Sequence, residues 1–328
     1  MQKTEKLNLQ KIVEPIKGYL EEVNEEIEKR LYTGIDLVDE CALHLFKRGG
    51  KKIRASLIIL SSGLKDQIPE NITTIAAAAE IVHAATLVHD DIIDKSSLRR
   101  GELTVSNKWG NKIAVLAGDF MYTRALEIAV GVDRYDMFPI LSSASQDMIL
   151  GELYQIQYSD IDLINIQHYL NIIELKTARF MAACAKLGSV IAGMSNSESD
   201  IMYDFGLKIG FAFQIIDDTL DYMDNFDNPE KDTASDFLSG KITLPYLRLL
   251  EKSSSYEKDQ LTEYARCPKH ESFAIVKKMI QSSNTFEYCI EVAREYVRDA
   301  VSLLDAFPSS IYKESIINLT TFMIERRY

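Results

Sequence analysis

Hydrophobic residues recur at helical spacing along most of this chain. Apolar side chains stand three and four positions apart and charged or polar residues fill the positions between, the pattern of amphipathic helices. The helices it predicts span residues 7–31, 73–94, 112–130, 142–158, 167–194 and 199–222. From residue 245 onward the pattern continues as several amphipathic helices without recognisable chemistry. The pattern therefore predicts an all-α protein.

Four breaks interrupt this pattern, at residues 49–50, 63–69, 96–110 and 224–240, and the last is the longest polar stretch. No repeat of 20–50 residues, low-complexity tract or Pro- and Ser-rich linker separates the helices. A single domain spanning residues 1–328 is the simplest interpretation. Loops beside acidic helix ends often carry function.

Composition supports a helical protein with a sizeable core. Of 328 residues, 46% are hydrophobic, and 15 Gly with 7 Pro provide few helix breakers. A net charge of −12 gives no basic footprint for nucleic acid. Four cysteines without a CxxC pair indicate reduced thiols in a cytoplasmic protein. The polar N-terminus has no signal core, and with no run of 18 apolar residues we expect no transmembrane segment.

An acidic cluster ends the predicted helix 73–94. Asp90 and Asp94 are four residues apart and share one helix face with Glu80, His83 and Leu87. The two carboxylates repel each other, and the negative end of the helix dipole disfavours them. A solvated acidic turn would explain a single cluster about as well as a site for Mg²⁺ that bridges to a diphosphate.

Two arginines, Arg99 and Arg100, follow this cluster after a short loop. Their guanidinium groups suit bidentate recognition of phosphate. Surface ion pairs are the alternative. Carboxylates followed by paired arginines favour the metal and diphosphate interpretation.

A second acidic cluster lies late in the predicted helix 199–222. Asp217 and Asp221 share a face, and Gln214 lies one turn before them. The neighbouring positions are predicted to be core residues: Phe211, Phe213, Ile215, Ile216 and Leu220. Two clusters that face each other could hold several Mg²⁺ ions around one diphosphate and neutralise charge on the leaving group. The polar stretch that follows carries Lys231 and Lys241, and it is either a segment that closes over a diphosphate or an ordinary charged loop.

These residues resemble the trans-isoprenyl diphosphate synthase family, also called polyprenyl synthetases. The resemblance extends from residue 49 to residue 245. It rests on the ordered motifs GGKKIR (49–54), VHAATLVHDDIIDKSSLRRG (82–101), GDFMYTRA (118–125), GELYQ (151–155), KTARF (176–180), FQIIDDTLDY (213–222) and EKDTASDFLSGKITLP (230–245). Ala55 stands where the family often has Pro, and Glu230 stands where Gly is usual.

The resemblance implies a single-domain antiparallel helical bundle around a central active-site cavity, the isoprenoid synthase fold, as a homodimer. It implies a prenyltransferase that uses three Mg²⁺ ions per active site and adds isopentenyl diphosphate units head-to-tail to an allylic diphosphate. Departure of the diphosphate would leave an allylic carbocation, which the double bond of isopentenyl diphosphate attacks, and a proton is then lost to the released diphosphate. Apolar walls would keep water from this cation.

The resemblance also implies site residues. The candidate catalytic residues are Asp90, Asp91, Asp94, Asp217, Asp218, Asp221, Lys176 and Lys231. Within this set the metal ligands are Asp90, Asp94 and Asp217. Isopentenyl diphosphate would contact Lys51, Arg54, His83 and Arg100. The allylic diphosphate would contact Arg99, Lys176, Thr177, Gln214, Lys231 and Lys241.

Product length is predicted from the residues before Asp90, where short-chain members carry an aromatic plug. Val82, Ala85 and Thr86 are small or branched, and residues 76–90 span roughly 21 Å of helix. We expect a product of about six to eight isoprene units.

Four other interpretations remain. The chain could be a non-catalytic subunit of a synthase complex, or a catalytic subunit that requires a small regulatory partner. It could be a class I terpene cyclase, although such enzymes usually replace the second Asp motif and lack the motif at residues 49–54. A metal-binding helical scaffold would not account for the Arg and Lys motifs.

Overall fold

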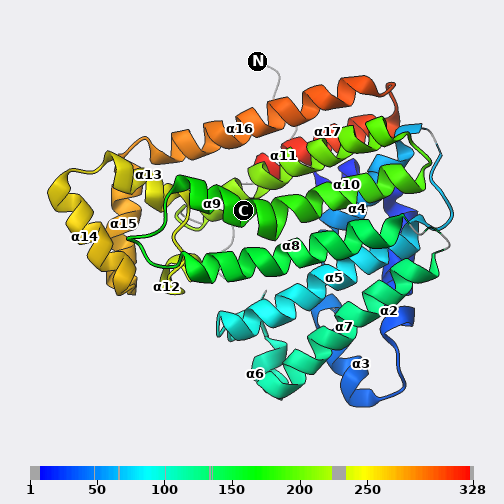
Figure 1. Ribbon diagram of the computed structural model, residues 1–328, viewed down its shortest axis with the longest axis horizontal. Coiled ribbons are helices and arrows are strands. Elements are labelled where there is room, and N and C mark those ends of the chain that lie inside the picture. Colours follow the sequence, from blue (N-terminus) through cyan, green and yellow to red (C-terminus); the bar gives the residue numbers. More distant parts are fainter. Residues whose placement is uncertain are drawn as a thin grey trace. The chain divides into compact units, whose positions relative to one another are not determined.

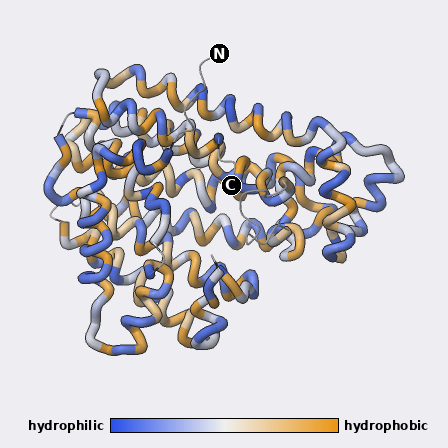
Figure 2. Tube along the Cα trace, turned by 180° about the vertical axis from the view of Figure 1, so that it is seen from behind, coloured by the Kyte–Doolittle hydropathy of each residue, from blue (hydrophilic) through white to orange (hydrophobic). Residues whose placement is uncertain are grey.

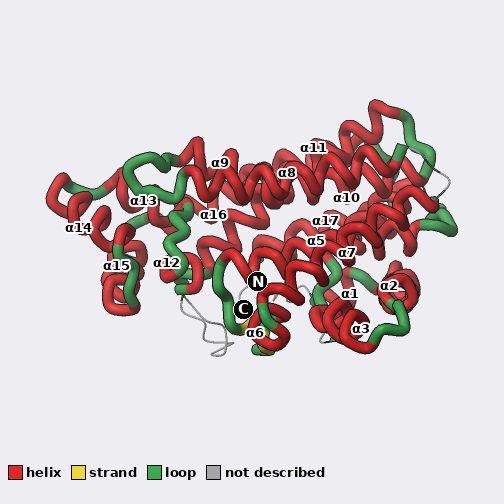
Figure 3. Tube along the Cα trace, turned by 60° about the horizontal axis from the view of Figure 1, so that its bottom comes forward, coloured by secondary structure: helices red, strands yellow, loops and turns green. Residues whose placement is uncertain are grey.

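The structure is a computed structural model that describes residues 8–47, 49–65, 67–99, 101–132, 134, 136–223 and 234–325. Helices make up most of these residues, as the red tube in Figure 3 shows. The only sheet in the described part pairs two short antiparallel strands, β1 (Leu98–Arg99) and β2 (Glu102–Leu103). The prediction of an all-α protein is confirmed.

The helices in chain order, labelled in Figure 1 except for α1, which is labelled in Figure 3, are α1 (Leu9–Ile12), α2 (Lys17–Leu31), α3 (Asp36–Leu43), α4 (Ile53–Ser62), α5 (Ile72–Ile93), α6 (Val105–Trp109), α7 (Asn111–Gly131), α8 (Met137–Gln157), α9 (Ile166–Ile173), α10 (Arg179–Ile191), α11 (Asn196–Leu220), α12 (Ser235–Leu238), α13 (Leu244–Lys252), α14 (Ser255–Arg266), α15 (His270–Ser282), α16 (Thr285–Leu303) and α17 (Ile311–Ile324). A π-helical turn, Glu174–Ala178, joins α9 to α10.

Three predicted boundaries were wrong. The helix predicted over residues 7–31 is interrupted between α1 and α2 by a 3₁₀ turn that contains Pro15, which has no N–H to donate. The break predicted at 96–110 contains α6, whose first turn is capped by the Thr104 hydroxyl. The break predicted at 224–240 contains α12. The short helices α1, α6 and α12 are four or five residues long, and a helix of this length is too short to give a periodic signal.

The residues group into two compact units, described separately below. The first comprises residues 1–145, 181–204 and 303–319, and the second comprises 146–180, 205–302 and 320–328. The prediction of a single domain therefore stays a prediction.

In the first unit α5 packs against α2, α4 and α7. Its alanines at 76–79 are fully buried, and their small side chains allow neighbouring helices to approach closely. By length and composition α5 could also cross a membrane, but 67% of its apolar window is buried inside the protein. Burial of this kind is expected of a core helix.

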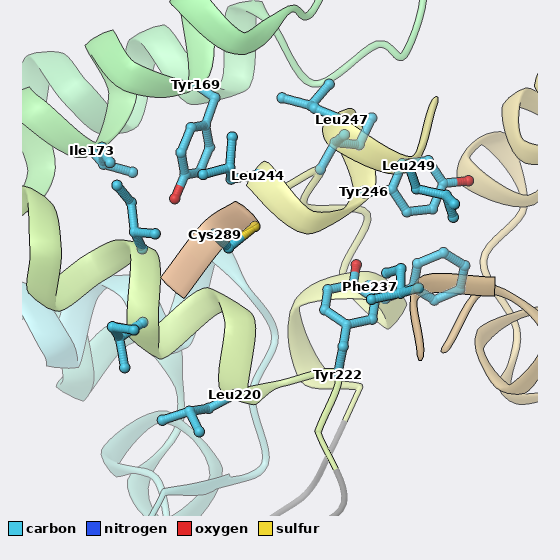
Figure 4. Packing of buried hydrophobic residues seen from close by; sticks show 14 of the residues in the cluster. Tyr169, Ile173, Leu220, Tyr222, Phe237, Leu244, Tyr246, Leu247, Leu249 and Cys289 are labelled. Atoms are coloured by element: carbon cyan, nitrogen blue, oxygen red, sulfur yellow. The ribbon is translucent and has the colours of Figure 1, made fainter. Parts of the chain in front are cut away.

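The core of the second unit contains aromatic side chains from segments far apart in the sequence (Figure 4). Phe273 on α15 packs against Tyr222 after α11 and against Phe237 on α12, with ring centroids 5.5 and 5.7 Å apart. Phe237 also contacts Tyr246 on α13. Burying each such ring stabilises the fold by roughly 1.5–3 kcal/mol. Along the helices the hydropathy alternates between orange and blue (Figure 2), as amphipathic packing requires.

Candidate active site

The first acidic cluster occupies the C-terminal end of α5. Asp90 and Asp94 are half-buried, and the N–H of Asp94, which caps the helix, donates to the carbonyl of Asp90 at 2.8 Å. Asp91 is only 1% exposed. The helix therefore directs the central carboxylate inward and leaves its two neighbours accessible.

Asp91 is held by Arg99. The guanidinium Nε lies 2.9 and 3.0 Å from the two carboxylate oxygens, and Nη2 lies 2.8 Å from Oδ1. A hairpin presents Arg99, and Gly101 supplies the positive φ of 75° that its turn requires. Sequence reasoning predicted a diphosphate contact for Arg99 and did not predict this bidentate pair. Arg100 lies outside the described residues.

The residues of the GGKKIR motif (49–54) lie before and within the first turn of α4. The helix begins at Ile53, and Lys52 at its N-cap has a left-handed backbone with φ of 48°. The buried carboxylate of Glu80 on α5 accepts the Ala55 N–H at 3.0 Å. This bond fixes the segment that carries Lys51 and Arg54. Of these side chains Lys51 is exposed and Arg54 half-buried, as is His83 on α5.

The second acidic cluster is at the C-terminal end of α11. Asp217 is half-buried, whereas Asp218 and Asp221 are each 4% exposed. Asp221 accepts the backbone N–H of Asp236 at 3.3 Å, which fixes the start of α12. Four of the five predicted core neighbours are buried, and Phe213 is half-buried.

Asp218 lies in an unusual environment for a carboxylate. It accepts a hydrogen bond from the Tyr169 hydroxyl at 2.7 Å and another from the Gln214 side-chain amide at 2.7 Å. Burial is the largest effect on its pKa and raises it well above its usual range, and the charge of Asp236 raises it further. The hydrogen bonds from Tyr169 and Gln214 each lower the pKa of Asp218.

The π-helical turn carries Lys176 and Thr177. Lys176 Nζ forms an ion pair with Glu152 and donates to Gln155 Oε1 at 3.0 Å, and both partners belong to the GELYQ motif on α8. Thr177 donates to Gln214 Oε1 at 2.8 Å. A π turn inserts an extra residue into the helix and redirects the side chains it carries.

Gly151 on α8 permits the close packing of this turn. A Cβ at that position would lie 2.8 Å from the backbone N of Lys176 and 2.9 Å from Leu175 Cβ. Gly210 on α11 has the same role toward Ala178, whose Cα would lie 2.4 Å from a Cβ there. The two glycines explain how α8 and α11 approach the turn so closely.

Of the two predicted lysines in the polar stretch, Lys231 lies outside the described residues. Lys241 is half-buried, its Nζ lies 4.0 Å from an Asp236 oxygen, and its backbone N–H donates to the Asp236 carbonyl. The segment that carries Lys241 is thus tied to α12.

Neither cluster by itself forms a complete metal cage. Among the described residues no three His, Cys, Asp or Glu side chains gather as a metal site. Mg²⁺ is usually bound by one or two carboxylates together with waters and substrate phosphates. A half-buried carboxylate in either cluster, such as Asp90 in the first or Asp217 in the second, is compatible with an ion that arrives with a diphosphate.

The residues expected to set product length are packed to different degrees. Val82 and Ala85 are fully buried in the first unit, whereas Thr86 is half-buried and donates its hydroxyl to the His83 carbonyl at 2.8 Å.

Sequence reasoning assigned no role to Glu80, Glu152, Gln155 or Tyr169. The motif at 151–155 gave a signal for Glu152 and Gln155, and the helical stripe gave one for Glu80. Tyr169 lies in none of the motifs, and we find no sequence signal for it.

Comparison with known proteins identifies the family. The family model described as polyprenyl synthetase matches residues 35–282. Octaprenyl diphosphate synthase of Haemophilus influenzae is 28% identical over 98% of this chain and 97% of its own length. Heptaprenyl diphosphate synthase component 2 of Bacillus subtilis is 31% identical over 93% of this chain and 87% of its own length.

The fold comparison agrees. A polyprenyl synthase of Caulobacter crescentus, crystallised with calcium and isoprenyl diphosphate, is 31% identical with a TM-score of 0.94, covering 99% of this chain and 100% of that one. Names of other relatives range from short chain to nonaprenyl diphosphate synthases.

The structure and these matches define an all-α prenyltransferase of the isoprenoid synthase fold. The chain belongs to the polyprenyl synthetase family, the trans-isoprenyl diphosphate synthases. The predictions of family, fold class and enzyme class are confirmed.

Proposed function

We propose that this protein transfers an allylic prenyl group to isopentenyl diphosphate, repeatedly and head-to-tail, and releases an all-trans polyprenyl diphosphate. The observation that carries this is made in each unit separately: half-buried Asp90 and Asp94 accompany the restrained cation Arg99 in the first unit, and half-buried Asp217 accompanies the restrained cation Lys176 in the second. Preorganised charges of both signs suit a reaction in which a diphosphate leaves.

The residues divide into two substrate groups. The allylic diphosphate contacts Arg99, Lys176, Thr177, Gln214, Lys231 and Lys241. Isopentenyl diphosphate contacts Lys51, Arg54, His83 and Arg100. The ion pairs of Arg99 with Asp91 and of Lys176 with Glu152 support the first group, because they orient each cation in advance.

Mg²⁺, three ions per active site, is the proposed cofactor, with Asp90, Asp94 and Asp217 as its protein ligands. When bound it supplies Lewis-acid neutralisation of the leaving diphosphate. Asp91, Asp218 and Asp221 act as supporting acids. Their burial supports this division, since each is at most 4% exposed.

We propose a product of about six to eight isoprene units, because no aromatic plug precedes Asp90 in the roughly 21 Å of helix from residue 76. The octaprenyl and heptaprenyl names of two relatives support this range. Thr86→Phe is expected to shorten the product. Ala85→Phe is also expected to shorten the product. Because Ala85 is buried, this larger side chain would in addition disturb the packing around it. Wild-type products from both variants would contradict the assignment.

Residues 1–328 are proposed to act as one cytoplasmic polyprenyl synthetase domain and as a homodimer. The family match spans residues of both units.

The second unit exposes an apolar stripe on α8, with Ile149, Leu150, Leu153 and Ile156 each 47–58% exposed. Such stripes mark interaction surfaces. The alternative occupant is a small second subunit, since one relative is named as component 2 of its enzyme.

The test is to incubate the purified chain with Mg²⁺, radiolabelled isopentenyl diphosphate and farnesyl diphosphate, and to resolve the dephosphorylated products. A ladder ending at about thirty to forty carbons is the expected result. Products of fifteen or twenty carbons from shorter primers would overturn the length and keep the activity. A hydrocarbon or alcohol would identify a cyclase. If activity appears only after cell extract is added, the chain is one component of a heteromer.

A further inference from the structure

The buried hydroxyl of Tyr169 connects α9 to the second acidic cluster. The side chain is 2% exposed and comes from a helix outside the family motifs. Its hydroxyl lies 2.7 Å from Asp218 Oδ2. Figure 4 shows the ring extending from α9 toward α11 beside Leu244, in the core of the second unit.

A chain of hydrogen bonds continues from this contact. Gln214 donates its amide to the other oxygen, Asp218 Oδ1, at 2.7 Å, and its own Oε1 accepts from the Thr177 hydroxyl at 2.8 Å. All four side chains belong to the second unit. The carboxylate thus selects one orientation of the Gln214 amide, and that orientation directs the proton of the Thr177 hydroxyl.

Removing the Tyr169 hydroxyl would leave Asp218 Oδ2 without this donor in a buried site. A buried acceptor that loses a partner is costly, and the carboxylate is expected to rotate toward other donors. Rotation would release Gln214, and Thr177 would lose the acceptor that fixes it.

We propose that Tyr169 is a positioning residue for the allylic substrate. Its hydroxyl fixes Asp218, and through Asp218 and Gln214 it sets the direction of the Thr177 hydroxyl. This inference rests on the proposed function, in which Thr177 and Gln214 contact the allylic diphosphate.

The first test compares Tyr169→Phe with a matched control, Tyr246→Phe. Tyr246 is also buried in the second unit, and its hydroxyl donates to the Leu261 carbonyl. We expect Tyr169→Phe to raise KM for farnesyl diphosphate about threefold to tenfold and to leave KM for isopentenyl diphosphate unchanged. The control should change neither KM. Equal KM values for wild type and Tyr169→Phe, or equal effects of the two variants, would overturn the inference.

A second measurement separates positioning from a general loss of packing. The Kd of farnesyl thiodiphosphate, a non-reacting analogue, is measured by calorimetry for Tyr169→Phe, Thr177→Val and the double variant. If Tyr169 acts through Thr177, adding Tyr169→Phe to Thr177→Val has no further effect on Kd. Additive effects would contradict the proposed chain. Thermal unfolding of each variant checks that it is folded. A wild-type protein that elongates nothing would refute the proposed function, whereas active wild type with unaltered Tyr169→Phe refutes only this inference.

Discussion

The two acidic clusters share one spacing but stabilise their central carboxylates by different means. In the first, the guanidinium of Arg99 makes a bidentate ion pair with buried Asp91. In the second, two neutral groups, the Tyr169 hydroxyl and the Gln214 amide, donate to buried Asp218. Neither of these two groups carries a positive charge, and burial raises the pKa of Asp218.

The repeated motif therefore fixes the direction of its second Asp, but it does not fix the electrostatic environment of that Asp. Helical geometry directs the second Asp of each DDxxD inward, and both are nearly inaccessible. The partner that meets it comes from elsewhere in the chain, a hairpin in one case and α9 in the other.

The outward-facing acids are expected to be equally essential in both clusters. Asp90→Asn and Asp217→Asn should each lower kcat for elongation about 10²–10³-fold, because each would remove a charge that the proposed site uses to hold Mg²⁺, which in turn would neutralise the leaving diphosphate. Steady-state kinetics at saturating Mg²⁺ measures this, with far-UV circular dichroism as the control for folding. A variant that keeps more than half of the wild-type kcat would remove its cluster from the proposed metal site.

The inward-facing acids should differ in stability when their partner is removed. Arg99→Met leaves a buried carboxylate without its counter-charge and should lower the free energy of unfolding by about 2–4 kcal/mol, allowing for the 29% exposure of Arg99. Tyr169→Phe should lower it by only about 1 kcal/mol. Urea denaturation gives both values. Adding Asp91→Asn to Arg99→Met should recover part of the loss, and equal losses at the two sites would contradict the comparison.

The π turn beside the second cluster should be sensitive to one methyl group. Gly151→Ala would press on the backbone of Lys176 and should cost about 1–3 kcal/mol of stability while raising KM for the allylic substrate. Gly18→Ala on α2 is the matched control. A Cβ there meets nothing within 4 Å, so it should stabilise the protein by up to about 1 kcal/mol. Thermal unfolding and KM together separate the two cases, and an unchanged KM in Gly151→Ala would show that the turn does not position Lys176.

The smallest effect is expected at the start of α11, the helix that carries the second cluster. The Ser195 hydroxyl, with its backbone N–H and Lys65, lowers the pKa of Glu198 from 4.5 to about 2. A lowered carboxyl pKa contributes stability above pH 4.5 that disappears as pH falls through 2. Glu198→Gln should therefore be less stable by at most about 0.5 kcal/mol at pH 7 and equal to wild type near pH 2. Denaturation midpoints of wild type and Glu198→Gln between pH 7 and pH 2 measure this difference in stability. A difference that does not change with pH would contradict the lowered pKa of Glu198.

Most long helices could be predicted from periodicity alone. α5, α7, α8 and α11 begin and end within five residues of their expected bounds, because long segments with apolar residues at helical spacing and few breakers give a clear helical signal. α6 and α12 could not be predicted in this way. They are single turns fixed by contacts such as the Asp221 carboxylate on the Asp236 N–H.

The candidate site likewise has features that follow from local sequence and features that depend on tertiary packing. The spacing of Asp90 and Asp94 and the placement of Lys51 and Arg54 before and in the first turn of a helix follow from local sequence, because neighbours within a helix are fixed by its 3.6-residue period. Local sequence was sufficient to identify the family, the acidic clusters and the cations beside them. The contacts of Arg99 with Asp91, of Glu80 with the start of α4 and of Tyr169 with Asp218 arise only in the folded structure. These pairs join residues from separate elements, and which donor meets a buried carboxylate depends on how helices and hairpins pack, which spacing along one chain does not encode.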